Sequence, residues 1–300
     1  MARSPLAITM SSKPRPAKGP RALDAPFGFA YGRAMFRALL ISAAIVSLPL
    51  AAGANEGLRA GSTSLCGDGY LTALALDKIS ALSWQSRSDL SLASESQRTL
   101  PQIWDEPEVL AKQTNTDIII FGPNEGTQSK GLEIESLSIS WGEGFDAVYA
   151  NAARLSRALN VPDTISPDIK ARLAALNSQQ KSRAAKPKIL YLSSSGSSAG
   201  PGTFVDAVIQ AAGGANIMTT PGWLTPDIEE IVSLSPDLIL LSFLDNSYAS
   251  ANEAAIRNRA LQRFIDKHMQ YDIHGSYWPC AGPYLIEAAE ELSAIIETIP

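Results

Sequence analysis

The sequence has few of the residues that metal sites and disulfide-rich folds require. Its 300 residues include two cysteines and two histidines. Two cysteines exclude a disulfide-dense scaffold, and the scarcity of histidine argues against a zinc site built from His and Cys. The sequence also lacks a G-x-x-x-x-G-K-[ST] phosphate-binding loop, which excludes a P-loop ATPase.

Positive charge is scarce outside the N-terminal segment. Residues 1–54 carry seven Lys or Arg and one acid, so the rest has 25 − 7 = 18 basic and 30 − 1 = 29 acidic side chains, a net charge of 18 − 29 = −11. Affinity for nucleic acid comes mainly from neutralised phosphates. An acidic body without a Lys/Arg cluster therefore predicts no nucleic-acid partner. The hydrophobic content of 45% is enough for one or two packed domains.

Residues 1–54 have the features of an N-terminal extension followed by a secretory signal peptide. An uncharged apolar run, residues 38–50, follows two arginines and precedes Ala52-Gly53-Ala54, a small-x-small cleavage signature. The run is shorter than the roughly 20 apolar residues that a membrane span needs. Met35 is a candidate start that gives a leader of ordinary length. We expect the mature protein to begin near Asn55 and to be soluble in an oxidising compartment.

Strand-like apolar runs alternate with helical patterns along the mature chain, which predicts βαβ units and parallel sheets. The predicted strands are residues 79–84, 117–121, 137–140, 188–192, 238–243 and 271–274. The predicted helices are residues 70–76, 107–114, 144–159, 204–212, 226–234, 251–267 and 283–298.

Residues 163–187 are predicted to be a helix that connects two lobes, residues 55–162 and 188–300. The apolar stripe of this segment is thin, and its distal end is wholly polar or small. A helix of this kind suits a solvent-facing bridge between two domains rather than a core.

A weak internal repeat supports the division into two lobes. The first copy reads Trp104-Asp-Glu-Pro107 and later Asp117-Ile-Ile-Ile, and the second reads Trp223-Leu-Thr-Pro226 and later Asp237-Leu-Ile-Leu. In each copy a Trp stands three residues before a Pro that opens a helix, and an Asp opens a buried strand. The repeat therefore predicts two similar lobes.

Aromatic side chains and a Ser-rich loop are the candidate ligand contacts. Residues 193–203 join a strand to a helix and place hydroxyls, including that of Ser195, at the carboxyl end of a parallel strand. Five aromatic residues lie in or beside predicted loops: Tyr70, Trp104, Trp223, Tyr277 and Trp278. A loop Trp often fills a local core, but several at the same ends of two lobes favour a cleft for a large, flat ligand.

Cys66 and Cys280 lie far apart in the sequence, one near each end of the mature chain, and Cys280 follows the predicted strand 271–274. Two free thiols are the alternative. In an exported protein that contains two cysteines, we predict that they form a disulfide.

Two segments of the second lobe carry a family pattern. One contains Ala-Ala-Gly-Gly-Ala-Asn-Ile at residues 211–217, and the other reads Pro-Asp-Ile-Glu-Glu-Ile-Val-Ser-Leu-Ser-Pro-Asp-Leu-Ile-Leu at residues 226–240. Shorter matches occur at residues 77–83, 108–110 and 117–120. These segments resemble the periplasmic solute-binding proteins of ABC importers for vitamin B12, ferric siderophores and haem, and the similarity covers roughly Ser62 to the C-terminus.

The resemblance implies an α/β fold of the class III periplasmic binding protein type, in which one long helix joins two lobes with parallel-type sheets. It implies a periplasmic, non-enzymatic protein without a cofactor of its own. The ligand would be cobalamin, a ferric siderophore or haem, and the partner would be an ABC permease in the inner membrane. Trp104, Trp223 and Tyr277 loosely match positions near the ligand in the B12-binding members.

Acids in the first turns of the repeated helices are candidate permease contacts. The family places an acid on the rim of each lobe, opposite basic residues of the permease. Glu229 lies eight residues before Asp237, which matches the family spacing, whereas Glu108 lies nine before Asp117 and leaves Glu106 as the alternative. The simpler interpretation of these acids is that they complement a helix dipole.

Three other functions stay open at this point. A haem-binding member needs an axial ligand, for which Tyr70, Tyr277 and His274 are candidates. An exported hydrolase could use the Ser-rich loop, but no partnered base is visible near it. A zinc- or manganese-binding protein would need more histidines than the sequence has.

Overall fold

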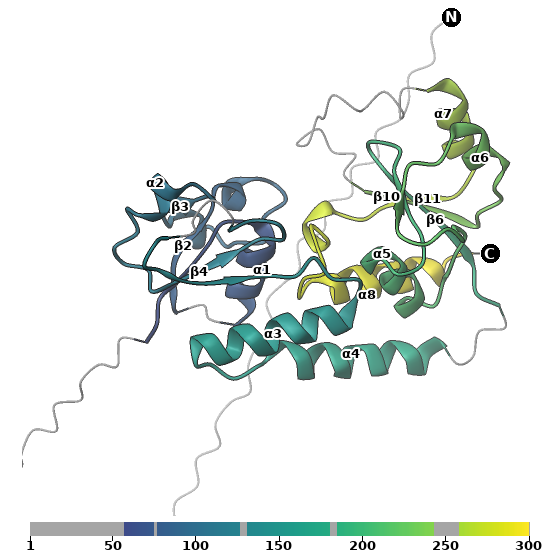
Figure 1. Cartoon of the computed structure of the whole chain (residues 1–300). Coiled ribbons are helices and arrows are strands. Elements are labelled where there is room, and N and C mark those ends of the chain that lie inside the picture. Colours follow the sequence, from purple (N-terminus) through teal and green to yellow (C-terminus); the bar gives the residue numbers. More distant parts are fainter. Residues whose placement is uncertain (1–56, 75–76, 127–130, 181–184, 243–257, 300) are drawn as a thin grey trace, which may run out of the picture. The chain divides into compact units, whose positions relative to one another are not determined.

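The computed structural model describes residues 57–74, 77–126, 131–180, 185–242 and 258–299 (Figure 1). The predicted signal peptide and the expected mature start at Asn55 lie outside the described residues. Residues 54–300 form one unit by their contacts. No helix in the described ranges has the length and apolar character that crossing a membrane requires.

The first half of the chain builds a five-stranded parallel sheet in the order β3-β2-β1-β4-β5. Its strands are β1 (Ala60–Ser62), β2 (Ile79–Ser83), β3 (Gln102–Ile103), β4 (Ile118–Phe121) and β5 (Glu135–Ser138). Its helices are α1 (Leu65–Leu74) and α2 (Pro107–Leu110), with short 3₁₀ turns at Trp84–Arg87 (η1) and Gln97–Thr99 (η2).

The second half builds a four-stranded parallel sheet in the order β11-β10-β6-β8. Its strands are β6 (Lys188–Ser193), β8 (Ala215–Asn216), β10 (Leu238–Ser242) and β11 (Gln270–Asp272), and β7 (Ser198–Ala199) and β9 (Trp223–Leu224) form a separate antiparallel ribbon. Its helices are α5 (Phe204–Ala211), α6 (Ile228–Ser233), α7 (Arg259–Ile265) and α8 (Leu285–Ile296), with a 3₁₀ turn at Gly275–Tyr277 (η4).

Strands β4 and β10, in the interior of the two sheets, are buried on both faces, as expected for parallel sheets covered on both sides. In β4 the side chains of Ile118 and Ile120 join the largest core cluster, whereas Ile119 and Phe121 join a second cluster on the opposite face. The largest cluster also takes residues of the second sheet, among them Leu240 of β10. The two halves therefore share one continuous apolar core.

The internal repeat has a structural counterpart in the sheets. The order β2-β1-β4-β5 in the first half corresponds to β8-β6-β10-β11 in the second. The repeated aspartates make the same contacts: Asp117 Oδ2 accepts from Arg59 N at 2.7 Å, and Asp237 Oδ2 accepts from Lys188 N at 2.6 Å. Each aspartate also donates its own N–H to the carbonyl of the same partner at 2.8 Å. The repeated Asp thus ties the start of one strand to the start of its neighbour.

Replacing either repeated aspartate by alanine should lower the free energy of unfolding by about 1 kcal/mol, because each exposed carboxylate accepts one backbone hydrogen bond. Asp77→Ala is the matched control. This aspartate is exposed and precedes β2, and its carboxylate has no hydrogen bond with another described residue. Urea unfolding of Asp117→Ala, Asp237→Ala and Asp77→Ala measures the effect. Equal stabilities for all three variants would contradict the role assigned to the repeat.

Two helices, α3 (Phe145–Leu159) and α4 (Ile165–Gln180), connect the sheets and lie side by side (Figure 1). Asn160 ends α3 in the left-handed region at φ 50°. α4 occupies most of the predicted connecting segment 163–187 and also contacts α5 and α8 of the second half.

Arg172 attaches α4 to α8. Its guanidinium donates to Glu290 Oε1 at 2.8 Å and to Glu287 Oε1 at 2.9 Å. The bonds from Arg172 lower the pKa of the Glu290 carboxyl. The thin apolar stripe of α4 is therefore supplemented by ion pairs with the second half of the chain.

Candidate functional site

A cleft of about 460 Å³ lies where the carboxyl ends of strands from both halves meet. Parallel strands bring their carboxyl ends to one edge of a sheet, where α/β proteins bind ligands. In this protein the segments that follow β1, β2, β4, β5 and β6 all contribute to the lining. The lining residues are Ser64, Leu65, Cys66, Gln85, Leu90, Gly122, Pro123, Glu125, Trp141, Ser193, Ser194, Ser195 and Pro279.

Trp141 is the large aromatic side chain of the cleft, and it is not among the predicted ligand contacts. It follows β5 and is 47% exposed. Its ring lies 6.3 Å from the ring of Phe204, which in turn lies 5.2 Å from Trp223, measured between centroids. Phe204 is buried, so it holds two exposed indoles, one from each half of the chain, against a common support.

The Ser-rich loop after β6 presents a chain of hydroxyl groups. Ser193 Oγ lies 2.9 Å from Ser195 Oγ, which lies 3.0 Å from Ser197 Oγ, and Ser197 Oγ lies 3.3 Å from Thr225 Oγ1. The structure thus places Ser195 in the cleft lining, as an uncharged group that can donate or accept.

Glu125 is the charged residue of the cleft lining. Its Oε2 accepts from Thr63 Oγ1 at 2.5 Å and from Gly122 N at 2.8 Å. These bonds fix the carboxylate in the loop that follows β4. Glu125 is likewise not among the predicted site residues.

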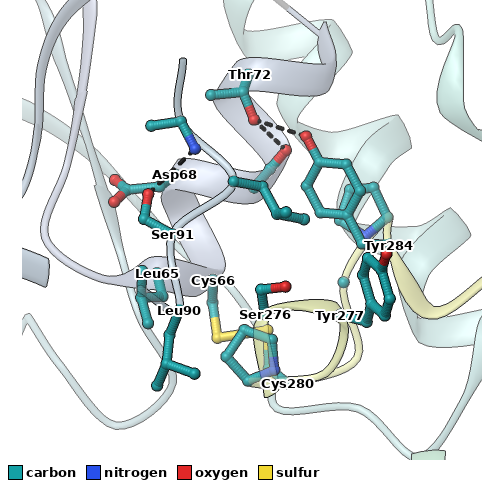
Figure 2. Close-up of a pocket in the computed structure, with 16 residues that line it drawn as sticks. Leu65, Cys66, Asp68, Thr72, Leu90, Ser91, Ser276, Tyr277, Cys280 and Tyr284 are labelled. Atoms are coloured by element: carbon teal, nitrogen blue, oxygen red, sulfur yellow. Dashed lines mark hydrogen bonds between the residues drawn. A yellow bond between two sulfur atoms is a disulfide. The ribbon is translucent and has the colours of Figure 1, made fainter. Parts of the chain in front are cut away.

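Cys66 and Cys280 form a disulfide, as predicted, with their Cα atoms 6.0 Å apart. The bond joins the first turn of α1 to the segment that precedes α8 (Figure 2). Tyr70 Oη donates to the carbonyl of Ala281 at 2.9 Å, and the Thr72 and Tyr284 hydroxyls lie 3.0 Å apart. We call this contact between α1 and residues 280–284 the seam.

A second cavity, of about 20 Å³, lies beside the disulfide (Figure 2). Its volume holds about one water molecule, so it cannot hold a large ligand. Tyr277 lines this small cavity together with Ser276 and Tyr284, and it is not among the residues that line the cleft. Its predicted role in ligand binding stays a prediction.

Asp68 is a buried carboxyl that lines the small cavity. Its Oδ1 accepts from Ser83 N at 2.9 Å, and its Oδ2 accepts from Ser83 Oγ at 2.6 Å. The pKa of Asp68 is raised from 3.8 to about 6, chiefly by burial; the bonds from Ser83 oppose the shift, and the charge of Glu125 adds to it.

The raised pKa of Asp68 predicts a pH-dependent stability. Between about pH 4 and pH 6 the folded protein holds a proton that the unfolded chain has released, so this contribution to stability falls as pH rises and is fully lost above about pH 6. Relative to Asp68→Asn, the wild type should lose roughly 2–3 kcal/mol across this window. Urea unfolding of both proteins from pH 4 to pH 8 measures the difference, and a constant difference would contradict the assignment.

Two of the predicted ligand contacts are core residues instead. Tyr70 is fully buried in α1, and Trp278 is 1% exposed with its indole N–H donating to Ser242 Oγ at 2.7 Å. Both belong to the largest core cluster. The expectation that they contact a ligand is wrong for this conformation, because core packing and hydrogen bonds already enclose their side chains.

The two predicted tryptophans outside the core are exposed, and Tyr277 is half-buried. Trp104 is 38% exposed at the carboxyl end of β3, next to Asp105, whose Oδ2 accepts from Gly126 N at 2.8 Å. Trp223 is 45% exposed on β9. Neither is among the lining residues of the cleft, although Trp223 shares Phe204 with Trp141.

The candidate docking acids are exposed at the starts of α2 and α6. Glu106 precedes α2 and Glu108 lies in its first turn, and Glu229 lies in the first turn of α6. Proline opens α2 as predicted, whereas α6 begins at Ile228, two residues after Pro226.

The Ser-rich loop contains Gly196-Ser197-Ser198-Ala199-Gly200, which satisfies the G-x-S-x-G pattern of a nucleophile elbow. An elbow exposes its serine at a strand-to-helix turn, but Ser198 is fully buried on β7 and donates to the Tyr191 carbonyl at 2.7 Å. His274 Nδ1 lies 2.7 Å from Ser276 Oγ, at the small cavity rather than at this loop. The described residues contain no group of three or more His, Cys, Asp or Glu side chains placed to hold a metal ion.

Comparison of the sequence with protein-family models and with curated proteins yields no match. Among solved structures, a periplasmic haem-binding protein from Pseudomonas aeruginosa matches with a TM-score of 0.63 and 18% identity over 81% of this chain and 94% of that one. The apo form of the periplasmic haem-binding protein RhuT from Roseiflexus sp. RS-1 matches with a TM-score of 0.65 and 17% identity over 80% and 98%. The periplasmic vitamin B12-binding protein BtuF of Vibrio cholerae matches with a TM-score of 0.59 and 17% identity over 81% and 97%. At these identities the likeness shows a shared fold.

Proposed function

We propose that the protein is the substrate-binding component of an ABC importer, which captures a large metal-centred ligand in its cleft and delivers it to a membrane permease. The observation that carries the proposal is the cleft itself, because strand ends from both halves line it in a fold shared with periplasmic binding proteins. Its volume lies in the range of small-molecule sites. The predicted signal peptide and the disulfide support a periplasmic location.

Cobalamin, a ferric siderophore and haem are the candidate ligands. Among the solved structures that share the fold, some are described as binding haem or vitamin B12, and one as a possible iron-binding protein. Haem binding in this fold would call for an axial Tyr or His, and none of the described residues that line the cleft is either. The cleft therefore supports cobalamin or a ferric siderophore better than haem.

Titration of the purified mature protein with cyanocobalamin, haemin and a set of ferric siderophores tests the proposal. Trp141 lines the cleft, so binding should change the intrinsic tryptophan fluorescence in a saturable way. Co-elution of ligand and protein in size exclusion provides an independent readout. Failure of every compound in both measurements would refute the proposed function.

Replacing Trp141 by alanine should weaken ligand binding by roughly ten- to a hundredfold, because a large ligand loses about 1–3 kcal/mol of apolar contact. The fold should survive, since the side chain is 47% exposed. Trp84→Ala is the matched control: this indole is 58% exposed and does not line the cleft. Calorimetric titration of both variants gives the ratio of affinities, and equal affinities would remove Trp141 from the site.

Trp223→Ala tests the second exposed indole, which shares Phe204 with Trp141. We expect it to weaken binding too, by a smaller factor than Trp141→Ala. Trp104 and Tyr277 stay proposed ligand contacts. Calorimetric titration of their alanine variants with the same ligand tests them.

A further inference from the structure

The described residues that line the cleft carry charge of one sign. Glu125 is the charged side chain among them, and no Lys, Arg or His belongs to this lining. The other polar groups are serine hydroxyls and the amide of Gln85. A bound ligand thus meets one carboxylate and a set of neutral donors and acceptors.

The carboxylate of Glu125 is held in place. Two donors, Thr63 Oγ1 and Gly122 N, bind the same oxygen, Oε2. The bonds prevent the side chain from turning away from a ligand. Asp68, a buried carboxyl whose pKa the charge of Glu125 helps to raise, carries a second negative charge above about pH 6.

Three arginines of the first half donate hydrogen bonds to backbone carbonyls. Arg98 donates to the carbonyls of Ser91 and Ala93, at 2.8 and 3.0 Å. Arg87 donates to the Arg98 carbonyl at 2.9 Å, and Arg154 donates to the Ser138 carbonyl at 2.9 Å. None of these guanidinium groups belongs to the cleft lining, and these hydrogen bonds hold them to neutral backbone carbonyls.

We propose, on the basis of the proposed function, that the cleft selects ligands without net negative charge and that Glu125 is the residue that sets this preference. An anionic group placed against a fixed carboxylate in a cleft loses hydration and meets like charge, which weakens binding. Neutral amide or hydroxamate groups instead match the hydroxyls of the Ser-rich loop. The ligand class is a neutral or cationic metal complex, in preference to one that carries carboxylates or catecholates.

Matched ligand pairs test the preference, because their members differ in charge and little else. The first pair is cyanocobalamin and its monocarboxylic acid, and the second is haemin dimethyl ester and haemin. Cationic ferrioxamine B completes the set. In whichever pair binds, the neutral member should bind about tenfold tighter to the wild-type protein, and added salt should reduce that ratio.

Glu125→Gln keeps an oxygen acceptor for Thr63 and Gly122 and removes the charge. It should bring the affinity ratio of a pair close to one, and it should weaken binding of ferrioxamine B about tenfold. Glu135→Gln is the matched control. This exposed acid is the first residue of β5 and lies at the amino ends of the strands, whereas the cleft lies at their carboxyl ends. Its loss should therefore leave the affinity ratio of each ligand pair unchanged.

The outcomes separate this inference from the proposed function. Binding that favours the anionic member of a pair, or a ratio that Glu125→Gln does not change, would overturn the charge preference while the importer function stands. If ferrioxamine B is the only compound that binds, an affinity for it that Glu125→Gln leaves unchanged would also overturn the charge preference. If no ligand of the set and no other siderophore binds, the proposed function fails and this inference fails with it.

Discussion

Removal of the disulfide between Cys66 and Cys280 should lower the free energy of unfolding by about 2–5 kcal/mol. The bond closes a loop over a sequence separation of 214, so its loss releases a large amount of conformational entropy in the unfolded chain. The double variant Cys66→Ser/Cys280→Ser should show the loss under all conditions. Urea unfolding of the wild type with and without reductant, beside the same pair of curves for the double variant, measures it.

The control lies within the same experiment, because reductant should have no effect on the double variant. Hydrogen bonds at the seam remain after reduction, including those of Tyr70 with Ala281 and of Thr72 with Tyr284, so the protein should stay folded at room temperature. Two alkylatable thiols in the unreduced, unfolded protein would contradict the disulfide in the secreted molecule. An unchanged unfolding midpoint after complete reduction would contradict its contribution to stability.

Reversing one acid on each half, Glu108→Lys together with Glu229→Lys, should abolish transport while ligand binding in solution stays unchanged. Both side chains are exposed in the first turns of corresponding helices, and neither is among the residues that line the cleft. Acids that face basic groups on a permease orient the encounter, and salt weakens such an interaction. Lysine in their place would repel the permease at both contacts.

Uptake of the ligand by cells that carry the double variant is the measurement. Glu135→Lys with Glu297→Lys is the matched control, because it makes the same change in total charge at two other exposed acids. The pair Glu106→Lys/Glu229→Lys tests the alternative acid of the first half. Normal uptake by both docking variants would leave these residues as ordinary helix-start acids and would count strongly against the importer function.

The long elements were predictable because their patterns are strong. Strands β4 and β10 each follow an Asp and consist of residues buried on both faces, all of them large and apolar except Ser242, as a covered parallel sheet requires. Helices α3 and α5 begin and end within one residue of the predicted bounds. The repeat of Trp, Pro and Asp correctly predicted corresponding elements in the two halves.

The short strands were missed because their residues have no strand preference of their own. β1 reads Ala-Gly-Ser, and it is a strand because β2 and β4 bind it on both sides. Gly61 leaves room for this arrangement, since a Cβ there would come within 2.9 Å of the Ile103 side chain. Tertiary neighbours, not the local sequence, determine this strand.

The candidate site was predicted only in part, for a related reason. A sequence does not show whether an aromatic residue beside a loop turns toward the core or toward solvent, so Tyr70 and Trp278 were placed with Trp223 although both are buried. Trp141 and Glu125 could have been found by asking which residues follow the carboxyl end of each predicted strand. Ligands bind at the carboxyl ends of parallel strands, so a search limited to the residues that follow those ends would have selected both.

The disulfide also determines what a protease can release from the molecule. Cys66 and Cys280 enclose most of the described chain in a covalent ring. Cleavage of one peptide bond anywhere inside the ring opens it but leaves a single covalently connected molecule, whose two sheets stay joined through the sulfur atoms. A nicked protein would therefore migrate as one species without reductant and separate into fragments only after reduction, and it could keep both sides of the cleft together despite the cut.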